Sequence, residues 1–493
     1  MSAAAPAKAK PLRKRKRWPV VLLALLAVLL YLLIGALAPF AVHPTVSEGF
    51  QSAFDLSSFY GYGGGSVDRA VLVEDNVDAL DLRIRMINES RERIVFANFD
   101  IRDCESGRDI AAALLAAAGR GVDIQILSDG MNGLVSMSPS PVFRALGRLE
   151  NVEIRYYNTP NLLMPWTFNG RMHDKYVIVD DRLLLIGGRN TFDKFLGDYL
   201  PPEKKSHDLE VLLYNTAAGT AESGNSVLFQ VEDYFHTVWT DRHTKTHLDA
   251  QPLLPGSTDK AAAELEARYA AMAAAKPALF SRDAVDYEAL TVPLEKVTFI
   301  HNPIDILSKE PWVWWQIQQL MENADERVYL QTPYAVCNEP MYAGLGRVAA
   351  KGIPFEMQVD STGVGDNFMA SSDYIHNKGR VLSTGVTVWE WFGDYSSHGK
   401  SVLIDNDLAL VGSYNLDMRS TYIDTEMMLV FHGEAFNAML EDYLADMESD
   451  SLQAADESTY VEKPGLIPWD NGDWKHSLFP ITSVLFQPFR YLL

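Results

Sequence analysis

Two stretches of the sequence follow one pattern: HDKYVIVDDRLLLIGGRN (residues 173–190) and HGKSVLIDNDLALVGSYN (residues 398–415). In each, a histidine and a lysine two positions apart are followed at the same intervals by an aspartate, a glycine and an asparagine. One His-x-Lys alone would be weak evidence, because residues two apart simply share one face of a β-strand. Two copies with identical spacing indicate that one structural unit, together with its reactive groups, occurs twice in the chain.

The sequence around the two motifs repeats as well. Ahead of each motif lie an apolar strand-like run, a helix-then-strand unit and a further strand-like run, and a glycine stands where each helix is expected to stop. Strands that alternate with helices predict two α/β halves whose sheets have mixed or mainly parallel pairing. The matched segments are residues 92–97 with 326–331, residues 111–130 with 342–361 (stop glycines Gly121 and Gly352), and the strands beginning at Val152 and Gly385.

The paired motifs are suited to chemistry on a phosphodiester. Histidine and lysine at positions i and i+2 point to one side of a strand, so two such strands related by an approximate two-fold axis bring two imidazoles and two ammonium groups together. One imidazole can attack phosphorus, the other can protonate the departing oxygen, and the lysines stabilise charge on the remaining oxygens, without a metal or other cofactor. The predicted catalytic set comprises His173, Lys175, Asp180, His398, Lys400 and Asp405.

The other polar residues of the motifs receive supporting roles. Asn190 and Asn415 are predicted to bind the substrate phosphate as neutral donors, while Asp180 and Asp405, near a turn, are expected to hold the loop rather than to react. A carboxylate behind each histidine would fix its tautomer and stabilise its cationic form. The candidates are Glu210 and Glu426, each at the start of an apolar strand after its motif.

Composition excludes several classes of protein. The chain of 493 residues is 47% hydrophobic, which is typical of a globular protein with a large core. The net charge is −22, and without the seven basic residues of the leader at 1–17 the rest of the chain is near −29. Such an acidic body should repel nucleic acid, although a lipid phosphodiester in a local basic pocket remains compatible with it. Two cysteines are too few for a disulfide scaffold or a zinc site, but Cys104 and Cys337 occupy equivalent repeat positions and are a hypothetical disulfide pair between the halves.

A membrane segment is expected near the start of the sequence. Residues 18–40 contain no charge and would form a helix of about 34 Å, enough to cross a hydrocarbon core of about 30 Å. A cleaved signal peptide is the alternative, since Ala36-Leu37-Ala38 is similar to a cleavage site, but the run is longer than the usual ~7–15 residues. We therefore expect an anchor whose basic leader stays in the cytoplasm, with everything after His43 on the outer side.

The last residues, 476–493, form an apolar, aromatic segment with two prolines, too short to span a membrane. This segment is expected either to lie in the membrane interface or to dock on the protein's own core. We divide the chain into a basic leader (1–17), a membrane helix (18–40), a first α/β domain (41–250), a connector (251–296), a second α/β domain (297–460) and an apolar tail (461–493).

The doubled motif resembles that of the phospholipase D superfamily, over roughly residues 75 to 450, and HGKSVLIDNDLALVGSYNLDMRSTYIDTE is particularly similar to bacterial cardiolipin synthases. The resemblance implies an α/β fold of two phospholipase D-like α/β/α repeats forming one pseudo-two-fold unit. It implies a bacterial cell-membrane enzyme that passes a phosphatidyl group through a phosphohistidine, with phosphatidylglycerol as acceptor and donor. His173 would be the nucleophile and His398 the general acid, although the sequence itself does not order the two.

Three other functions remain open at this stage. A hydrolytic phospholipase D would release phosphatidic acid because water captures the intermediate. A phosphodiesterase acting on nucleic acid is disfavoured by the acidic body. A membrane-tethered scaffold with an inactive site is disfavoured by two intact motifs.

Overall fold

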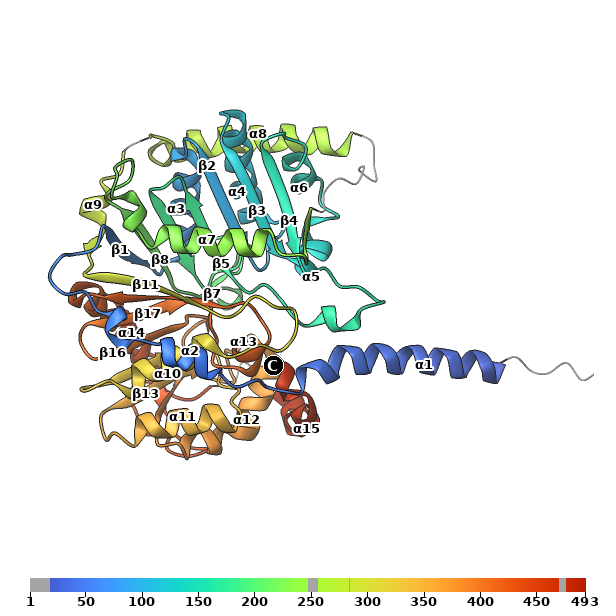
Figure 1. Ribbon diagram of the computed structural model, residues 1–493, viewed down its shortest axis with the longest axis vertical. Coiled ribbons are helices and arrows are strands. Elements are labelled where there is room, and N and C mark those ends of the chain that lie inside the picture. Colours follow the sequence, from blue (N-terminus) through green and yellow to red (C-terminus); the bar gives the residue numbers. More distant parts are fainter. Residues whose placement is uncertain (1–17, 247–255, 283, 470–475) are drawn as a thin grey trace, which may run out of the picture.

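The computed structural model describes residues 18–246, 256–282, 284–469 and 476–493; the basic leader lies outside the described residues. Two mixed β-sheets, one in each half of the chain, dominate the structure (Figure 1). The strands of the first sheet run in the order β10 (Val292–Pro293), β1 (Asp68–Val73), β8 (Glu210–Asn215), β6 (Leu183–Gly187), β5 (Lys175–Val179), β2 (Arg93–Asn98), β3 (Asp123–Asp129), β4 (Val152–Tyr157) and β9 (Thr244–Thr246).

The second sheet repeats the first. Its order is β11 (Lys296–His301), β18 (Met427–His432), β17 (Leu408–Gly412), β16 (Ser401–Ile404), β12 (Val328–Gln331), β13 (Phe355–Asp360), β14 (Thr387–Trp391) and β19 (Ser451–Gln453). In both sheets three neighbouring strands pair in parallel, β2–β3–β4 and β12–β13–β14, and the remaining pairs are antiparallel. The predicted pair of mixed α/β halves is therefore confirmed, and each sheet matches the other strand for strand from β1 and β11 onward.

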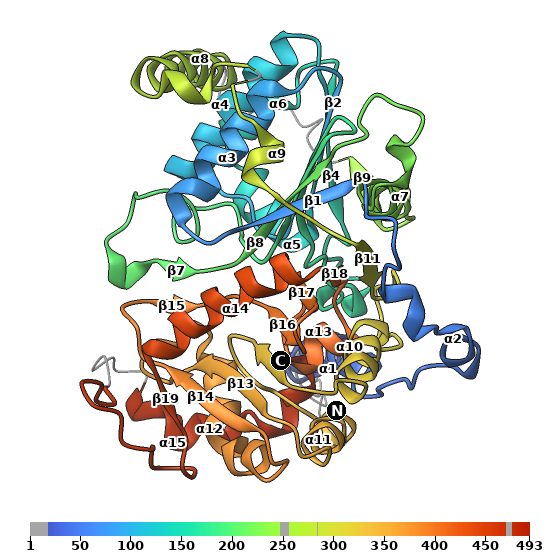
Figure 2. The same ribbon diagram turned by 90° about the vertical axis from the view of Figure 1, so that its left-hand side faces the viewer.

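Each sheet buries one face under its own helices and the other against the opposite half. The first outer layer contains α3 (Asn76–Glu89), α4 (Glu105–Gly119), α6 (Pro141–Leu146) and α8 (Ser257–Ala275), and the second contains α10 (Trp312–Glu322), α11 (Glu339–Ala349), α12 (Phe368–Leu382) and α13 (Met418–Tyr422). The inner faces share one apolar core with α7 (Leu228–Trp239) and α14 (Glu434–Ser449) (Figure 2). Gly121 and Gly352 follow the ends of α4 and α11 with φ of 90° and 76°, a conformation that glycine adopts without a steric penalty.

The N-terminal part of the described chain projects from the body as helix α1 (Trp18–Leu37), none of whose residues is buried (Figure 1). It is the one helix among the described residues that is long and apolar enough to cross a membrane. The division that placed residues 41–67 in the first domain needs correction, because Phe59 lies in the core of the second half and Ser47 N–H donates to Glu310. The first sheet begins only at Asp68.

The segments on either side of the second domain also pack on neighbouring helices. The connector contains helix α8, which contacts α4 and α6 of the first half. The end of the chain forms α15 (Phe479–Leu485), which packs on α12, and Arg490 forms an ion pair with the buried Asp373 of that helix. Docking on the protein's own core is thus observed for this tail, although its outward face is apolar, as described below.

Candidate active site

Two short stretches of parallel backbone pairing join the halves and hold each motif histidine against the opposite half. Met172 forms a bridge with Thr425, and His173 N–H donates to the Thr425 hydroxyl at 3.0 Å. At the equivalent place β7 (Ser206–His207) pairs with β15 (Ser396–Ser397), and His398 N–H donates to the His207 carbonyl. Each histidine therefore enters the site on backbone held by the other half of the chain.

Both histidines line one cavity of about 410 Å³, and each is 8% exposed. The cavity also contains two arginines, Arg171 and Arg419, which the sequence analysis did not single out. Arg171 is held by Asp129, and Arg419 contacts Asp424 at 3.2 Å. The remaining lining residues are Phe99, Asn190, Tyr334, Asp366, Asn367, Phe368, Met369, Asn415, Asp417, Ser420 and Asp424.

A carboxylate backs each imidazole, and each carboxylate comes from the opposite half. Nδ1 of His173 lies 2.7 Å from Oε1 of Glu426, and Nδ1 of His398 lies 2.7 Å from Oδ2 of Asp208. These contacts occupy Nδ1 in both rings, which leaves Nε2 as the nitrogen for a substrate. An acid that fixes the tautomer of a histidine in this way is the arrangement expected for nucleophilic or acid–base work.

The assignment of Glu210 to a histidine is wrong. Its carboxylate is buried between two guanidinium groups, accepting from Arg83 at 2.8 Å and lying 3.3 Å from Arg189. Strand register explains the error, because Gly187 pairs with Glu210 whereas Gly412 pairs with Met428. The true counterpart of Glu426 is therefore two residues earlier, at Asp208. Only the strand pairing reveals this match, because the intervals from the motif glycines to the two acids differ in the sequence.

Electrostatics distinguishes the two carboxylates. Burial raises the pKa of the Glu426 carboxyl well above its ordinary value, and Lys175 offsets this only in part. Burial would also raise the pKa of Asp208, but Lys400 and His398 outweigh it, so the pKa lies below its ordinary value. Asp208 therefore stays ionised next to His398, while Glu426 takes up a proton more readily.

The histidines themselves are held towards the neutral form. Burial and then Lys175 lower the pKa of His173 well below its usual range. Burial and Lys400 lower the pKa of His398, and the carboxylate of Asp208 opposes them. A negative charge beside His398 favours its protonated form, which makes the two imidazoles chemically unequal despite their symmetric surroundings.

The motif lysines lie beneath the histidines. Nζ of Lys175 donates to the main-chain carbonyl of His173 at 2.6 Å, and Nζ of Lys400 contacts both Nδ1 and the carbonyl of His398. Both lysines are 1% exposed, and burial lowers the pKa of Lys175 to about 7 against the pull of Glu426. Both amino groups thus contact the two histidines that line the cavity.

The motif asparagines face the cavity from the two halves. Asn190 and Asn415 both line it, and the side-chain oxygen of each is buried without a protein partner. Phe99 packs edge-on against the ring of His173 at 4.9 Å between centroids. Buried polar groups without protein partners are uncommon, so these amides are available for a polar ligand.

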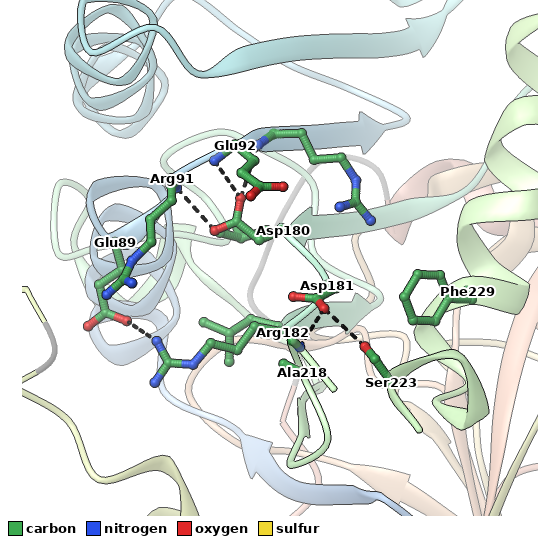
Figure 3. A pocket seen from close by; sticks show the side chains of 13 residues that line it. Glu89, Arg91, Glu92, Asp180, Asp181, Arg182, Ala218, Ser223 and Phe229 are labelled. Atoms are coloured by element: carbon green, nitrogen blue, oxygen red, sulfur yellow. Dashed lines mark hydrogen bonds and ion pairs between the residues drawn. The ribbon is translucent and has the colours of Figure 1, made fainter. Parts of the chain in front are cut away.

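Asp180 and Asp405 lie at the far ends of β5 and β16, away from the cavity. The carboxylate of Asp180 accepts hydrogen bonds from the backbone N–H groups of Arg91, Glu92 and Arg93. Figure 3, a close view of a second pocket, shows Asp180 beside Arg91 and Glu92. Asp405 binds the N–H groups of residues 325–327 in the same way. Both adopt a positive φ, 53° and 51°, which short polar side chains tolerate. Their place in the catalytic set is corrected: they anchor the turn, as the sequence pattern also indicated.

The two cysteines are free thiols in the structure. Cys337 is fully buried in the core of the second half, while Cys104 precedes α4 in the first. The hypothesis of a disulfide between the halves is therefore not supported.

Fold and site together define a phospholipase D-like protein: a pseudo-two-fold pair of mixed sheets with one motif histidine from each on a shared cavity. The family model described as "Cardiolipin synthase, PLD-like domain" matches residues 83–221 and 317–448. The chain belongs to this family of cardiolipin synthases with phospholipase D-like domains.

Individual relatives agree with this placement. Cardiolipin synthase C of Escherichia coli is 25% identical over 417 residues, covering 75% of this chain and 82% of that protein. Cardiolipin synthase B of Salmonella typhi is 25% identical over 377 residues, covering 76% and 78%. In fold, the chain is similar to the crystal structure of phosphatidylserine synthase from Haemophilus influenzae, with a TM-score of 0.61 at 14% identity, covering 86% of this chain and 95% of that one. Membership of the family supports a phospholipid phosphatidyltransferase as the class of enzyme.

Proposed function

We propose that this protein is a membrane-anchored phosphatidyltransferase of the cardiolipin synthase type, using phosphatidylglycerol as both donor and acceptor. The observation that carries the proposal is the pair of histidines, His173 and His398, which come from opposite halves to one cavity and are each backed by a carboxylate. The basic groups around them suit a phosphodiester, and the family supports a lipid as its carrier.

In the first half-reaction, Nε2 of His173 attacks phosphorus of the donor lipid. The P–N bond forms as the P–O bond to glycerol breaks, and His398 gives its proton to the departing alkoxide, so that free glycerol leaves. Lys175 and Lys400 contact the two histidines, and Asn190 and Asn415 line the cavity, so the ammonium groups and the amide N–H groups support the charge on the non-bridging oxygens.

In the second half-reaction, a hydroxyl of the acceptor lipid enters where glycerol left. His398, now neutral, takes the hydroxyl proton while the oxygen attacks phosphorus and the P–N bond to His173 breaks. One phosphodiester replaces another, so no nucleotide is consumed. Capture by water instead would give phosphatidic acid.

The unequal carboxylates favour this order of the histidines. The ionised Asp208 next to His398 supports its protonated form, which a general acid needs at the start. His173 faces a carboxyl whose pKa is raised, and its own pKa is lowered well below the usual range. A neutral imidazole with a free lone pair is the form required of a nucleophile.

The anchor and its orientation belong to the same proposal. Helix α1 is apolar and unburied, which supports a membrane span in a bacterial cell membrane. The basic residues before it predict a cytoplasmic leader and catalytic domains on the outer side.

Product analysis tests the function. The purified full-length protein is incubated with phosphatidylglycerol vesicles in a metal chelator, and lipids and released glycerol are identified by mass spectrometry, with His173→Ala as the matched control. Cardiolipin and glycerol in equal amounts, both lost in the variant, are the expected result. Phosphatidic acid alone would make the protein a hydrolase, and a lack of product from this lipid would refute phosphatidylglycerol as donor.

A further inference from the structure

We propose that a collar of apolar side chains around the cavity mouth lies within the same bilayer that α1 spans, so that the catalytic cavity opens onto the membrane surface. The collar consists of Leu162 and Leu163 at a loop tip, Met369 at the cavity rim, and Ile481, Val484, Leu485 and Phe489 on the tail. This inference depends on the proposed anchor but not on the reaction, and it goes beyond both because it assigns a second membrane contact.

The loop that carries Leu162 and Leu163 runs along the last turns of α1. Tyr31 donates its hydroxyl proton to the Leu163 carbonyl at 2.6 Å, and Asn169 donates to the Ala36 carbonyl at 2.6 Å. Between these contacts Pro165 packs directly on Gly35, where a Cβ atom would come within 2.3 Å of its ring. The absence of a side chain at Gly35 thus lets the loop approach the helix closely.

This contact fixes the depth of the loop tip relative to the helix. Tyr31 lies six residues before the end of α1 at Leu37, which corresponds to about 9 Å along the helix axis. If α1 spans the membrane, the level of Leu163 lies within the outer part of the bilayer. Leu162 and Leu163 are 69% and 80% exposed in the protein alone, so lipid rather than protein would cover them.

The tail presents a second apolar face at the same side of the molecule. Phe479 and Ser483 face inward, where Phe479 stacks on Phe368 of α12 at 5.2 Å between centroids. The exposed side chains of residues 480–489 are all apolar: two prolines and four larger side chains at helical spacing. The larger ones are Ile481 (64% exposed), Val484 (61%), Leu485 (60%) and Phe489 (44%).

Arg419 ties these segments to the cavity. It lines the cavity, donates to the Asn169 carbonyl of the loop at 3.0 Å and donates to the Leu492 carbonyl of the tail at 2.9 Å. Met369, 40% exposed, lines the same cavity from the start of α12. In both ribbon views the end of the chain lies next to the point where α1 joins the body (Figures 1 and 2).

A bilayer is the partner that fits these facts. The collar is continuous with a helix that is itself exposed and uncharged over its whole length, and a helix of that composition is stable in lipid. A diacyl lipid could then present its headgroup to His173 and His398 while its chains stay in the membrane. The collar thus supplies a route for substrate that does not require a lipid to leave the bilayer.

Fluorescence quenching tests the placement directly. Leu163→Cys, Leu485→Cys and, as a control, Leu290→Cys on α9 (Tyr287–Leu290) are made in a Cys104→Ser background and labelled with bimane, since Cys337 is fully buried. The full-length proteins are reconstituted in phosphatidylglycerol vesicles that contain acyl-chain-brominated lipid. We expect emission from positions 163 and 485 to fall at least about twofold and that from 290 to stay unchanged. Equal, weak quenching at all three positions would overturn the proposal.

A second comparison separates substrate access from chemistry. Leu162→Asp/Leu163→Asp and the matched Leu162→Met/Leu163→Met keep α1, so both stay in the bilayer. We expect the aspartate variant to turn over vesicle lipid several-fold more slowly while it retains turnover of a monomeric short-chain phosphatidylglycerol. Equal loss on both substrates would overturn the collar. Quenching at 163 and 485 in a protein that transfers no phosphatidyl group would support the collar and refute only the proposed reaction.

Discussion

Oε1 of Glu426 lies 2.7 Å from Nδ1 of His173, a residue 253 positions earlier in the chain. The reciprocal contact joins Asp208 of the first half to His398 of the second. Each histidine is therefore held by a carboxylate from the opposite half, and neither half contains a complete site. A duplicated fold whose catalytic groups are exchanged in this way must keep both halves in register to function.

The first prediction concerns Asp208. Asp208→Asn should lower kcat for phosphatidyl transfer by about 10³–10⁴-fold, because an amide neither stabilises the imidazolium of His398 nor fixes its tautomer. The thermal midpoint should fall as well, because Asp208 is the buried counter-charge of Lys400, so rates are compared at a temperature where the variant is folded. Rates with phosphatidylglycerol vesicles and melting curves on the same samples provide the measurement.

Glu210→Gln is the matched control, two residues away at the start of β8. Stability should fall here too, by about 3–5 kcal/mol, because Arg83 and Arg189 are left buried without their counter-charge. The folded fraction should keep most of its activity. If Glu210→Gln abolished catalysis at a temperature where the protein is folded, Glu210 would regain a place behind a histidine.

The second prediction concerns the order of the histidines. With a phosphatidyl donor whose leaving group is a stable anion such as p-nitrophenolate, His398→Ala should still form a covalent adduct, because departure of that group needs no acid. The adduct should accumulate, since no base remains to activate the acceptor. Intact-protein mass spectrometry should show one added phosphatidyl group in His398→Ala and none in His173→Ala. An adduct on His398 in the His173→Ala protein would reverse the roles.

Much of this architecture could be predicted from local patterns. The motif spacing from His173 to Asn190 and from His398 to Asn415 follows the length of one β-hairpin, so it is fixed by local geometry and visible in the sequence. Gly121 and Gly352 mark helix ends for an equally local reason, their positive φ.

The residues that were not predicted depend on contacts with residues far away along the chain. Asp208 was missed because Glu210, two positions later, is also an acid at the start of an apolar strand, and only the pairing of Gly187 with Glu210 shows which acid matches Glu426. The packing of Phe59 on the second half likewise follows from tertiary structure, because nothing near it in the sequence indicates which core it enters.

The third prediction concerns Asp180. Asp180→Ala should lower the free energy of unfolding by about 1–2 kcal/mol, because the N–H groups of residues 91–93 lose their acceptor. At temperatures where the variant is folded, kcat should stay within about twofold of the parent, since the carboxylate is a strand length from the cavity. Chemical denaturation and initial rates measure the two effects, with the exposed Asp123→Ala as control. A loss of kcat as large as that of His173→Ala would restore Asp180 to the catalytic set.

The last prediction is that burying Lys175 lowers the stability of the fold, although catalysis needs this residue. Burial lowers the pKa of this lysine to about 7 in the folded protein, against an ordinary value of 10.5. Below pH 7 it is charged in both the folded and the unfolded state, so the cost of burying the charge is fully present. Between about pH 7 and 10.5 the folded protein has lost the proton while the unfolded chain keeps it, and the cost declines as pH rises. Lys175→Met removes that charge.

We therefore expect Lys175→Met to raise the thermal midpoint relative to the parent, and to raise it more at pH 6 than at pH 9, while phosphatidyl transfer is lost at both. Taking the difference between variant and parent at each pH cancels the titration of distant groups. The matched variant Lys175→Arg keeps a charge at every pH, so its thermal midpoint relative to the parent should also fall as pH rises, and it should be most unfavourable at pH 9. A Lys175→Met protein that is less stable at pH 6 than at pH 9, relative to the parent, would mean that the lysine is held by its acidic neighbours more strongly than burial opposes it.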